Sequence, residues 1–378
     1  MYNRLYLHVP FCVKKCHYCA FISRAPGKNE LLEYPDLLMR ELQLQASGAE
    51  PVASIYFGGG TPSLLQPEQL ARVLDGIAGH TGIQADAEIT LEANPGSVDH
   101  VSLKAFRDAG INRISLGIQS FDDHFLDCLG RIHTSEQSRK AFSDARKAGF
   151  KNVSIDLIHS LPGQSLDQWR SELKQAVELC PEHISIYGLT VEEGTPFARI
   201  YPANSPELAD DDLSADMFEL ADELLTESGF EHYEIANYAR PGYRAQHNSG
   251  YWRRDGYLGL GVAAHSFLRE GHGVRFSNPD TLEEYRRGVM AAQLTRVDEH
   301  QLTQDDAMAE YMFLALRLSE GVNLSTFEHE FGRSIESVYG STPADLARLG
   351  LLIQNKSVLT MTRRGMLLSN QVFSRFLI

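Results

Sequence analysis

The sequence has no long hydrophobic run, few cysteines and no excess of positive charge. No apolar stretch approaches the roughly 20 residues that a membrane-spanning helix needs, so we expect at most peripheral contact with a membrane. The first residues lack the basic region and apolar stretch of a secretory signal. Five cysteines, an odd number in a chain of 378 residues, do not indicate a disulfide framework. These absences predict a cytoplasmic protein.

The balance of charge excludes another class of function. The chain has 50 Asp and Glu against 35 Lys and Arg, a net charge of −15. A surface of this sign repels nucleic acid and anionic lipid, so no nucleic-acid partner is expected. A hydrophobic content of 43% with 22% charged residues is ordinary for a globular protein, and the length predicts one large domain and a smaller one.

Short apolar runs alternate with longer amphipathic stretches through the first half of the chain. This alternation predicts an α/β fold of βα units around a parallel sheet, either an open barrel or a doubly wound sheet. Polar residues follow the strands, where barrels build their active sites. The expected strands are residues 5–9, 52–57, 87–91, 113–118, 153–158 and 183–189. The expected helices are residues 31–46, 67–79, 98–109, 135–148 and 166–179.

The rhythm breaks after Thr190. A segment rich in Pro and Asp precedes an acidic helix, an aromatic stretch and further helices to about Arg317. From Asn323 the pattern becomes helix, helix, a hairpin around "GLLIQNKSVLTMT" and a last helix, which is typical of a winged-helix-like module. We therefore expect a partial barrel, a barrel-closing extension and a mostly helical C-terminal domain, in residues 1–200, 201–300 and 301–378.

Three of the five cysteines lie within eight positions. Cys12, Cys16 and Cys19 have the spacing C-x3-C-x2-C just after the first expected strand. Three thiolates on one loop suit three irons of a [4Fe–4S] cubane, and the fourth iron can then bind the amine and carboxylate of S-adenosylmethionine. A zinc site completed by His8 or His17, or three unrelated buried thiols, would give the same spacing. Cys128 and Cys180 fall in helical patterns and are expected to be ordinary buried thiols.

Glycines and polar strand ends strengthen the cluster interpretation. Gly58 to Gly60 follow the second strand without the lysine of a phosphate-binding loop, and they let a ligand approach the backbone. Glu92, Gln119 and Asp156 stand at the ends of three later strands. Each side chain taken alone is compatible with a solvated strand end. Together on one rim they indicate a site for a ligand with amino, carboxylate and ribose groups.

The sequence resembles the radical S-adenosylmethionine enzymes and, within them, the oxygen-independent coproporphyrinogen III oxidase family. The resemblance runs nearly end to end, through "YLHVPFCVKKCHYC", "YFGGGTPSLL", "EITLEANPG", "RISLGIQSFDDHFLDCLGRIH", "DLIHSLPGQ" and "LTMTRRGMLLSN". It implies an incomplete (β/α)6 TIM-like barrel, with the three cysteines as ligands of the [4Fe–4S] cluster. The residues that it implies for S-adenosylmethionine are Tyr6, Gly59, Gly60, Thr61, Glu92, Gln119, Arg131 and Asp156.

Two branches of this family compete. The oxidase proper decarboxylates propionates, whereas the haem chaperone (HemW-type) branch binds haem and delivers it to haem proteins, respiratory enzymes among them. Three features favour the chaperone branch: strand one begins almost at residue 1, Phe21 occupies the place of the oxidase's fourth cysteine, and His247-Asn248-x-x-Tyr251 matches the branch's haem motif. A non-catalytic iron–sulfur and S-adenosylmethionine sensor is the third alternative. Catalytic activity and a homodimer are left open.

The haem expectation centres on His247 and Tyr251. Four further aromatic residues, Tyr238, Tyr243, Trp252 and Tyr257, surround the motif. His is the commonest protein ligand of haem iron. Arg253 and Arg254 would pair with haem propionates, and His265 is a second candidate ligand. Packing of the aromatic residues as a lid over the barrel is the alternative. Downstream, Ala263 stands where the family pattern has a glycine.

Overall fold

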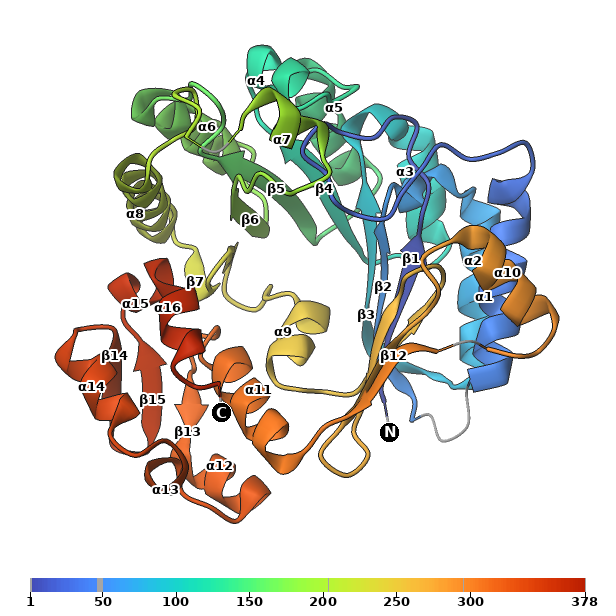
Figure 1. Ribbon diagram of the computed structural model, residues 1–378. Coiled ribbons are helices and arrows are strands. Elements are labelled where there is room, and N and C mark those ends of the chain that lie inside the picture. The colour runs from blue at the N-terminus through green and yellow to red at the C-terminus, as the bar shows by residue number, and fades with distance from the viewer. Residues whose placement is uncertain (1, 46–49, 203, 295, 378) are drawn as a thin grey trace.

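The computed structural model describes residues 2–45, 50–202, 204–294 and 296–377. Its centre is a curved parallel sheet (Figure 1). The α/β fold and all six expected strands are confirmed, with ends that shift by a few residues. The parallel strands are β1 (Arg4–Val9), β2 (Val52–Gly59), β3 (Ile83–Ala93), β4 (Arg113–Gln119), β5 (Val153–His159) and β6 (His183–Gly188).

Helices cover the outer face of this sheet (Figure 1). Capping boxes fix where several begin; Thr134 and Gln137, for example, satisfy each other's backbone N–H groups at the start of α5. Helix α4 was not expected, and the expected end of the first helix at residue 46 lies outside the described residues. The helices of this half are α1 (Glu30–Gln45), α2 (Pro67–His80), α3 (His100–Asp108), α4 (Asp123–Cys128), α5 (Ser135–Lys147) and α6 (Leu166–Glu178).

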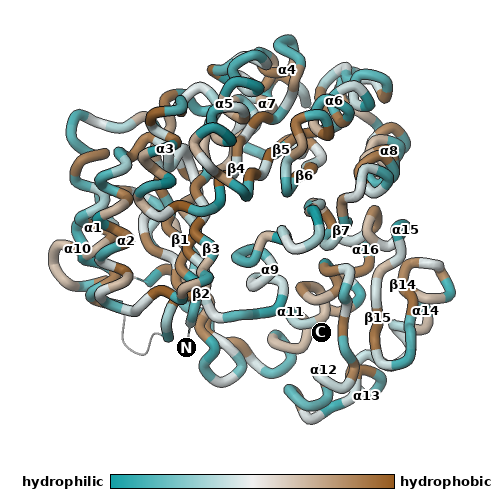
Figure 2. Tube along the Cα trace, turned by 180° about the vertical axis from the view of Figure 1, so that it is seen from behind, coloured by the Kyte–Doolittle hydropathy of each residue, from teal (hydrophilic) through white to brown (hydrophobic). Residues whose placement is uncertain are grey.

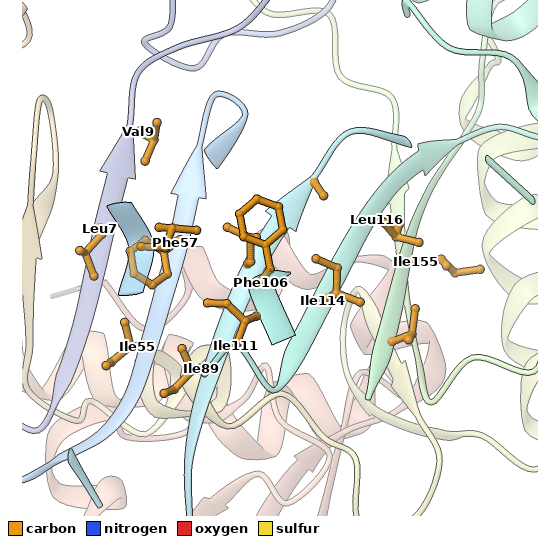
Figure 3. Packing of buried hydrophobic residues seen from close by; sticks show 14 of the residues in the cluster. Leu7, Val9, Ile55, Phe57, Ile89, Phe106, Ile111, Ile114, Leu116 and Ile155 are labelled. Carbon is orange, nitrogen blue, oxygen red and sulfur yellow. The ribbon is translucent and has the colours of Figure 1, made fainter. Parts of the chain in front are cut away.

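Strand β4 shows how the sequence sorts its side chains between the two faces. Ile114, Leu116 and Ile118 are fully buried on the outer face, where Phe106 and Ile111 are among the side chains packed with the strands (Figure 3). Each such side chain contributes about 1.5–3 kcal/mol by leaving water. The alternate positions, which include Arg113 and Gln119, face the inside of the barrel. A polar inner face is therefore built into the alternation itself.

The segment after Thr190 differs from the expectation. It forms short strands as well as helices, so the expected run of helices up to Arg317 is wrong. Strand β9 pairs in parallel with β1, and β8 pairs antiparallel with β6. Among the described residues one twelve-stranded sheet results, in the order β12-β11-β10-β9-β1-β2-β3-β4-β5-β6-β8-β7. The strands are β7 (Glu231–Glu234), β8 (Asn237–Ala239), β9 (Tyr257–Leu260), β10 (His265–Leu268), β11 (Val274–Ser277) and β12 (Val297–Gln301).

One helix of this segment lies on the inner face of the sheet. Helix α9 (Gln246–Trp252) contains the His247 motif and sits between the sheet and the C-terminal helices (Figure 1). Figure 2 draws it in pale and teal colours, in contrast to the brown of the neighbouring strands. The other helices are α7 (Pro196–Ile200), α8 (Asp211–Glu227) and α10 (Leu282–Met290).

The C-terminal residues have a hydrophobic core of their own, which includes Met308, Phe327 and Phe376. The expected hairpin is present, and a third strand completes a small antiparallel sheet. The division at residues 200 and 300 stays a prediction. Within the described residues, no helix is both long and apolar enough to cross a membrane. The elements here are α11 (Gln304–Ala315), β13 (Val322–Asn323), α12 (Leu324–Phe331), α13 (Ile335–Tyr339), α14 (Thr342–Arg348), β14 (Leu352–Asn355), β15 (Val358–Met361), α15 (Arg363–Leu367) and α16 (Ser369–Ser374).

Candidate functional site

The loop with the three cysteines is closed at its base. The Cys12 N–H donates to the Arg24 carbonyl at 3.0 Å, and the Arg24 N–H donates to the Pro10 carbonyl at 3.0 Å. The Arg24 guanidinium also grips Glu30 of α1 with two hydrogen bonds of 2.8 and 2.7 Å. The loop therefore leaves β1 and returns to it, so its cysteines stay at the carboxyl end of the barrel.

These cysteines share one cavity with the polar strand ends. The cavity has a volume of about 500 Å³, which is the size of a site for one small organic ligand. Tyr6 is the one predicted residue of this group outside the lining, because its hydroxyl lies 2.9 Å from Nδ1 of His8 within the barrel wall. The predicted residues that line the cavity are Cys12, Cys16, Cys19, Gly59, Gly60, Thr61, Glu92, Gln119, Arg131 and Asp156.

The glycines are required by the close approach of the cysteine loop. A Cβ atom on Gly60 would lie 2.5 Å from the Phe11 carbonyl oxygen, and Gly59 has a φ of +108°. The Thr61 N–H donates to that same Phe11 oxygen at 2.7 Å, and its hydroxyl lies 3.6 Å from the Cys12 Sγ. A side chain at Gly60 would push the loop away from the strand ends, and one at Gly59 would clash with the His8 imidazole 2.6 Å away.

Glu92 is held in place by donors from the neighbouring strand. The Tyr56 hydroxyl donates to Oε1 at 2.7 Å, and the Gly59 N–H donates to Oε2 at 3.2 Å. Burial raises the pKa of Glu92 to about 7, and the nearby Asp156 carboxylate adds to this rise. A buried carboxyl of this kind gains most from a cationic ligand group.

Opposite the glycines, Arg131 bridges the cavity wall and the cysteine loop. Its Nη2 donates to the Gly117 carbonyl at 2.6 Å, and its Nη1 lies 3.4 Å from the Cys16 Sγ. Gln119 has a φ of 69°, and its buried Oε1 has no hydrogen-bond partner in the described part of the chain. Ser115 donates to Asp156 at 3.3 Å, and burial raises the pKa of Asp156. Since buried polar atoms are nearly always paired, Gln119 indicates a ligand in this cavity.

The zinc alternative fits less well. The two ring nitrogens of His8 face the Tyr6 hydroxyl and the Ile22 carbonyl at 2.9 and 3.0 Å, and Nδ1 of His17 faces the Cys128 carbonyl at 3.0 Å. Among the described residues, no three His, Cys, Asp or Glu side chains are arranged around a single metal ion. A cubane places each thiolate on a different iron, which matches three cysteines spread along one cavity wall.

Comparison with known proteins identifies the family. Residues 6–176 match the model of the radical SAM superfamily, and residues 302–368 match that of the HemN C-terminal domain. Heme chaperone HemW of Lactococcus lactis subsp. lactis is 35% identical, with 100% of this chain and 97% of that one covered. Heme chaperone HemW of Escherichia coli is 36% identical over 99% and 97%. The chain belongs to the HemW family of the radical SAM superfamily.

A solved structure gives the same fold. Coproporphyrinogen III oxidase (HemN) from Escherichia coli superposes with a TM-score of 0.86 at 25% identity, covering 100% of this chain and 90% of that one. The radical SAM domain implies a [4Fe–4S] cluster and S-adenosylmethionine. The residues present fit both groups: thiol donors, a glycine cradle that a Cβ would fill and an unpaired Gln119 Oε1 surround one cavity.

The haem motif of this HemW-family chain is buried. His247 is 1% exposed, its Nδ1 lies 2.8 Å from the Ser54 Oγ and its Nε2 lies 2.7 Å from the Tyr251 hydroxyl. Glu88 accepts the His247 N–H at 2.9 Å, which fixes the start of α9 to strand β3. Burial lowers the pKa of His247 well below its usual value, and Arg4 lowers it further. The imidazole is neutral, and both of its nitrogens have protein partners.

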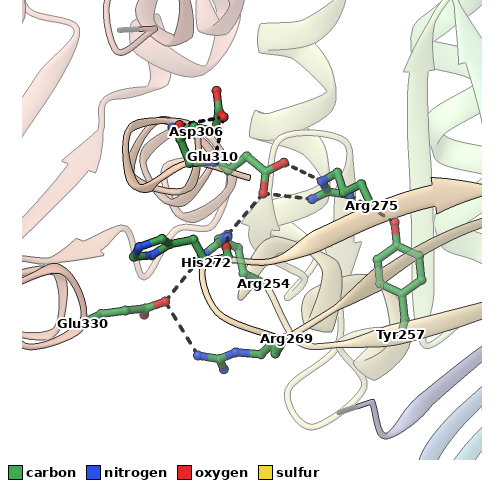
Figure 4. A network of polar contacts seen from close by, with 9 residues as sticks. Arg254, Tyr257, Arg269, His272, Arg275, Asp306, Glu310 and Glu330 are labelled. Carbon is green, nitrogen blue, oxygen red and sulfur yellow. Dashed lines mark hydrogen bonds and ion pairs between the residues drawn. The ribbon is translucent and has the colours of Figure 1, made fainter. Parts of the chain in front are cut away.

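The two arginines after the motif pair with carboxylates of this chain, and their expected pairing with propionates stays a prediction. Nε of Arg254 donates to Glu310 at 3.3 Å and its Nη1 to Glu330 at 3.3 Å (Figure 4). Arg253 pairs with Glu320 of the C-terminal region at 3.0 Å. These pairs tie the end of the motif's helix to the C-terminal domain. Arg254 is buried by them, whereas the Arg253 side chain stays 47% exposed.

Three smaller expectations can also be checked. Cys180 is exposed, which corrects its expected burial, and Cys128 is half-buried with its Sγ 3.4 Å from the Tyr201 hydroxyl. His265 is exposed at the start of β10. Ala263, where a glycine was expected, has a φ of 55° in the left-handed region that favours glycine.

Sequence reasoning missed several residues of the site. Tyr56 holds Glu92, and its place two residues before Gly58 in an alternating strand was a usable signal. Exposed Tyr187, near the end of β6, lines the cavity itself. Lys14, Lys15 and Glu192 also line it, but they lie on loops where no periodicity marks them.

Proposed function

We propose that this protein is a haem chaperone. It holds a [4Fe–4S] cluster and S-adenosylmethionine in the barrel cavity, binds haem and delivers it to acceptor haem proteins, respiratory enzymes among them. End-to-end identity of 35–36% with two chains named Heme chaperone HemW carries the proposal. The cavity adds support, because exposed Phe21 stands on its edge where the oxidase pattern has a fourth cysteine.

In this proposal Cys12, Cys16 and Cys19 ligate the cluster. When bound, the cluster supplies redox chemistry at an open iron that the amine and carboxylate of S-adenosylmethionine can approach. Arg131 keeps the cluster loop and β4 at a fixed separation through its contacts with Cys16 and Gly117. The positive charge of Arg131 also offsets the negative charge of the thiolates.

The strand ends orient S-adenosylmethionine. The Gly59–Gly60 turn and Thr61 receive the methionyl end close to the cysteines, and Glu92 accepts from its amino group. The unpaired Oε1 of Gln119 and the Asp156 carboxylate hold the ribose and adjacent polar groups. Tyr6 acts indirectly: it stacks on Tyr56, the residue that holds Glu92, with ring centroids 6.2 Å apart.

His247 and Tyr251 belong to the haem site in this proposal. Ligation of iron by His247 requires Nε2 to leave the Tyr251 hydroxyl, or Nδ1 to leave Ser54. The imidazole is already neutral, so no proton has to be removed before it binds iron. Binding through Nε2 is therefore coupled to loss of the hydrogen bond with Tyr251.

The decisive experiment combines three assays on anaerobically reconstituted protein. We expect haem to bind in an absorption titration, to transfer to an acceptor apoprotein, and coproporphyrinogen III to remain unconverted. Formation of protoporphyrinogen would restore the oxidase alternative. A reconstituted cluster that binds S-adenosylmethionine without any haem binding would favour the sensor. A cytoplasmic location and a homodimer are further parts of the proposal, to be checked by fractionation and by light scattering.

A further inference from the structure

Arg113 is a buried cation for which the described residues supply no ion-pair partner. It is the first residue of β4, is 2% exposed and lies on the inner face of the barrel, two positions before Ser115. Its Nε is buried without a hydrogen bond. Among the described residues, no carboxylate oxygen pairs with its guanidinium within 4 Å. Arg254, by contrast, is equally buried but has two carboxylate partners.

The groups around Arg113 are already engaged with one another. His183 lies between the Ser154 Oγ and the Tyr233 hydroxyl, at 2.8 Å from each. His247 is engaged on both ring nitrogens, as described above. Burial lowers the pKa of both histidines, and the charge of Arg113 lowers both further, so the cation stands among neutral imidazoles.

The acids within reach of its field also have other partners. Glu92 accepts from Tyr56 and Gly59, and Asp156 accepts from Ser115. Burial raises the pKa of both carboxyl groups, and the Arg113 charge opposes that rise. A guanidinium has five N–H donors in a planar fork that matches a carboxylate. In this chain that fork is left unused in the interior of the barrel.

An unpaired buried charge is unfavourable for folding, and such groups are retained where a ligand uses them. Ser115, which shares the inner face of β4 with Arg113, lines the cavity together with Asp156, and the Arg113 charge lowers the pKa of His247 in α9. A ligand that reaches both the cavity and α9 therefore meets this guanidinium. Arg131 lines the cavity itself, and it is engaged by the Gly117 carbonyl and the Cys16 thiol.

We propose that Arg113 binds a carboxylate of the ligand held inside the barrel, and that this carboxylate is a propionate of haem. The inference rests on the proposed haem-binding function and adds to it the group that recognises the porphyrin side chain. The carboxylate of S-adenosylmethionine is not the occupant, because that group belongs beside the cysteines and Arg113 lies deeper in the barrel than the cavity-lining Ser115.

The test compares two iron porphyrins that differ in charge alone: haem, and haem with both propionates converted to amides. For the unaltered protein we expect haem to bind about ten- to a hundredfold more tightly than the bisamide, the range of a charged hydrogen bond. Arg113→Gln should remove this preference, with little change in affinity for the bisamide or for S-adenosylmethionine. Arg113→Lys, which keeps the charge but not the fork, should lie between the two.

Arg254→Gln is the matched control, because it removes a buried arginine that has ion-pair partners. It should lower the melting temperature and leave the preference for haem intact. Arg113→Gln should melt at an unchanged or higher temperature, since it removes an unpaired charge. A large fall in the melting temperature of Arg113→Gln with equal losses for both porphyrins would make Arg113 structural and overturn the proposal.

The unaltered protein separates the remaining outcomes. Equal affinity for haem and the bisamide would overturn the carboxylate site and leave haem binding intact. If neither porphyrin binds, both the Arg113 site and the proposed haem-chaperone function are overturned. Should Arg113→Gln not fold, the haem-to-bisamide ratio in the unaltered protein and in Arg113→Lys still decides the question.

Discussion

The Nε2 atom of His247 lies 2.7 Å from the hydroxyl of Tyr251, four residues along the same helix. Their rings meet edge to face with centroids 4.9 Å apart. The two residues of the haem motif are therefore each other's partner in this structure. An iron ligand that uses Nε2 of His247 or the Tyr251 hydroxyl must first break this contact, which makes the pair directly testable.

Tyr251→Phe should favour haem binding if His247 is the ligand. The change removes the hydroxyl partner of Nε2, and a hydrogen bond of this type contributes about 0.5–1.5 kcal/mol, so affinity should rise about two- to tenfold. His247→Ala should shift the Soret band and weaken binding, with the cluster absorption unchanged. Loss of the iron spectrum in Tyr251→Phe would instead identify Tyr251 as the ligand.

Replacing Cys12, Cys16 or Cys19 with Ser should each abolish the anaerobically reconstituted chromophore. The described lining of the cavity contains three cysteines, one for each of three irons of a cubane, so no other thiol there can replace a lost one. Cys128→Ser is the matched control, because its thiol is half-buried but faces Tyr201. An equal loss of absorption in this control would contradict the ligand assignment.

Binding of S-adenosylmethionine should strengthen as the pH rises from about 6 to about 8. The pKa of Glu92 is raised to about 7 by burial, so below that value binding of the amino group must first displace a proton. Glu92→Gln should weaken binding about ten- to a hundredfold and flatten this pH dependence. Equilibrium titration at several pH values measures both effects. An unchanged slope in the variant would assign the titration to another group.

Ala263→Gly should stabilise the protein by up to about 1 kcal/mol. The left-handed conformation of Ala263 costs an L-residue about 1–2 kcal/mol, which glycine avoids. The greater freedom of glycine in the unfolded chain cancels part of this stabilisation. Chemical denaturation gives the difference in unfolding free energy. Ala264→Gly, next in the chain and fully buried without a positive φ, should be destabilising and serves as the control.

The barrel strands and the cysteine loop were readable from sequence because their signals are local. Strand β4 is an apolar run flanked by helical patterns. The spacing of Cys12, Cys16 and Cys19 is visible within eight consecutive residues. The strand ends followed from one rule, that parallel strands finish on the same edge, and Glu92 and Gln119 do line one cavity.

The second half was harder because its strands are short and their partners are remote. Tyr257–Leu260 contains four residues, and it becomes a strand because β1, some 250 positions earlier, leaves an edge open to it. No local pattern encodes that pairing. The isolation of Arg113 was equally hidden: alternation in "RISLGIQ" shows which way the side chain faces, but its lack of a partner depends on contacts made by β2, β5, β6 and α9.

Strand β1 contacts both helix α9 and the cysteine loop. Arg4, near its start, donates to the Gln246 carbonyl of α9 at 3.0 Å, and His8, near its end, lies 3.0 Å from the Ile22 carbonyl of the cysteine loop. The two residues are four positions apart along the strand, a span of about 13 Å. If haem displaces α9, the displacement reaches the cluster loop along one rigid element. Thermodynamic reciprocity then requires S-adenosylmethionine to change the affinity for haem by the same factor by which haem changes the affinity for S-adenosylmethionine.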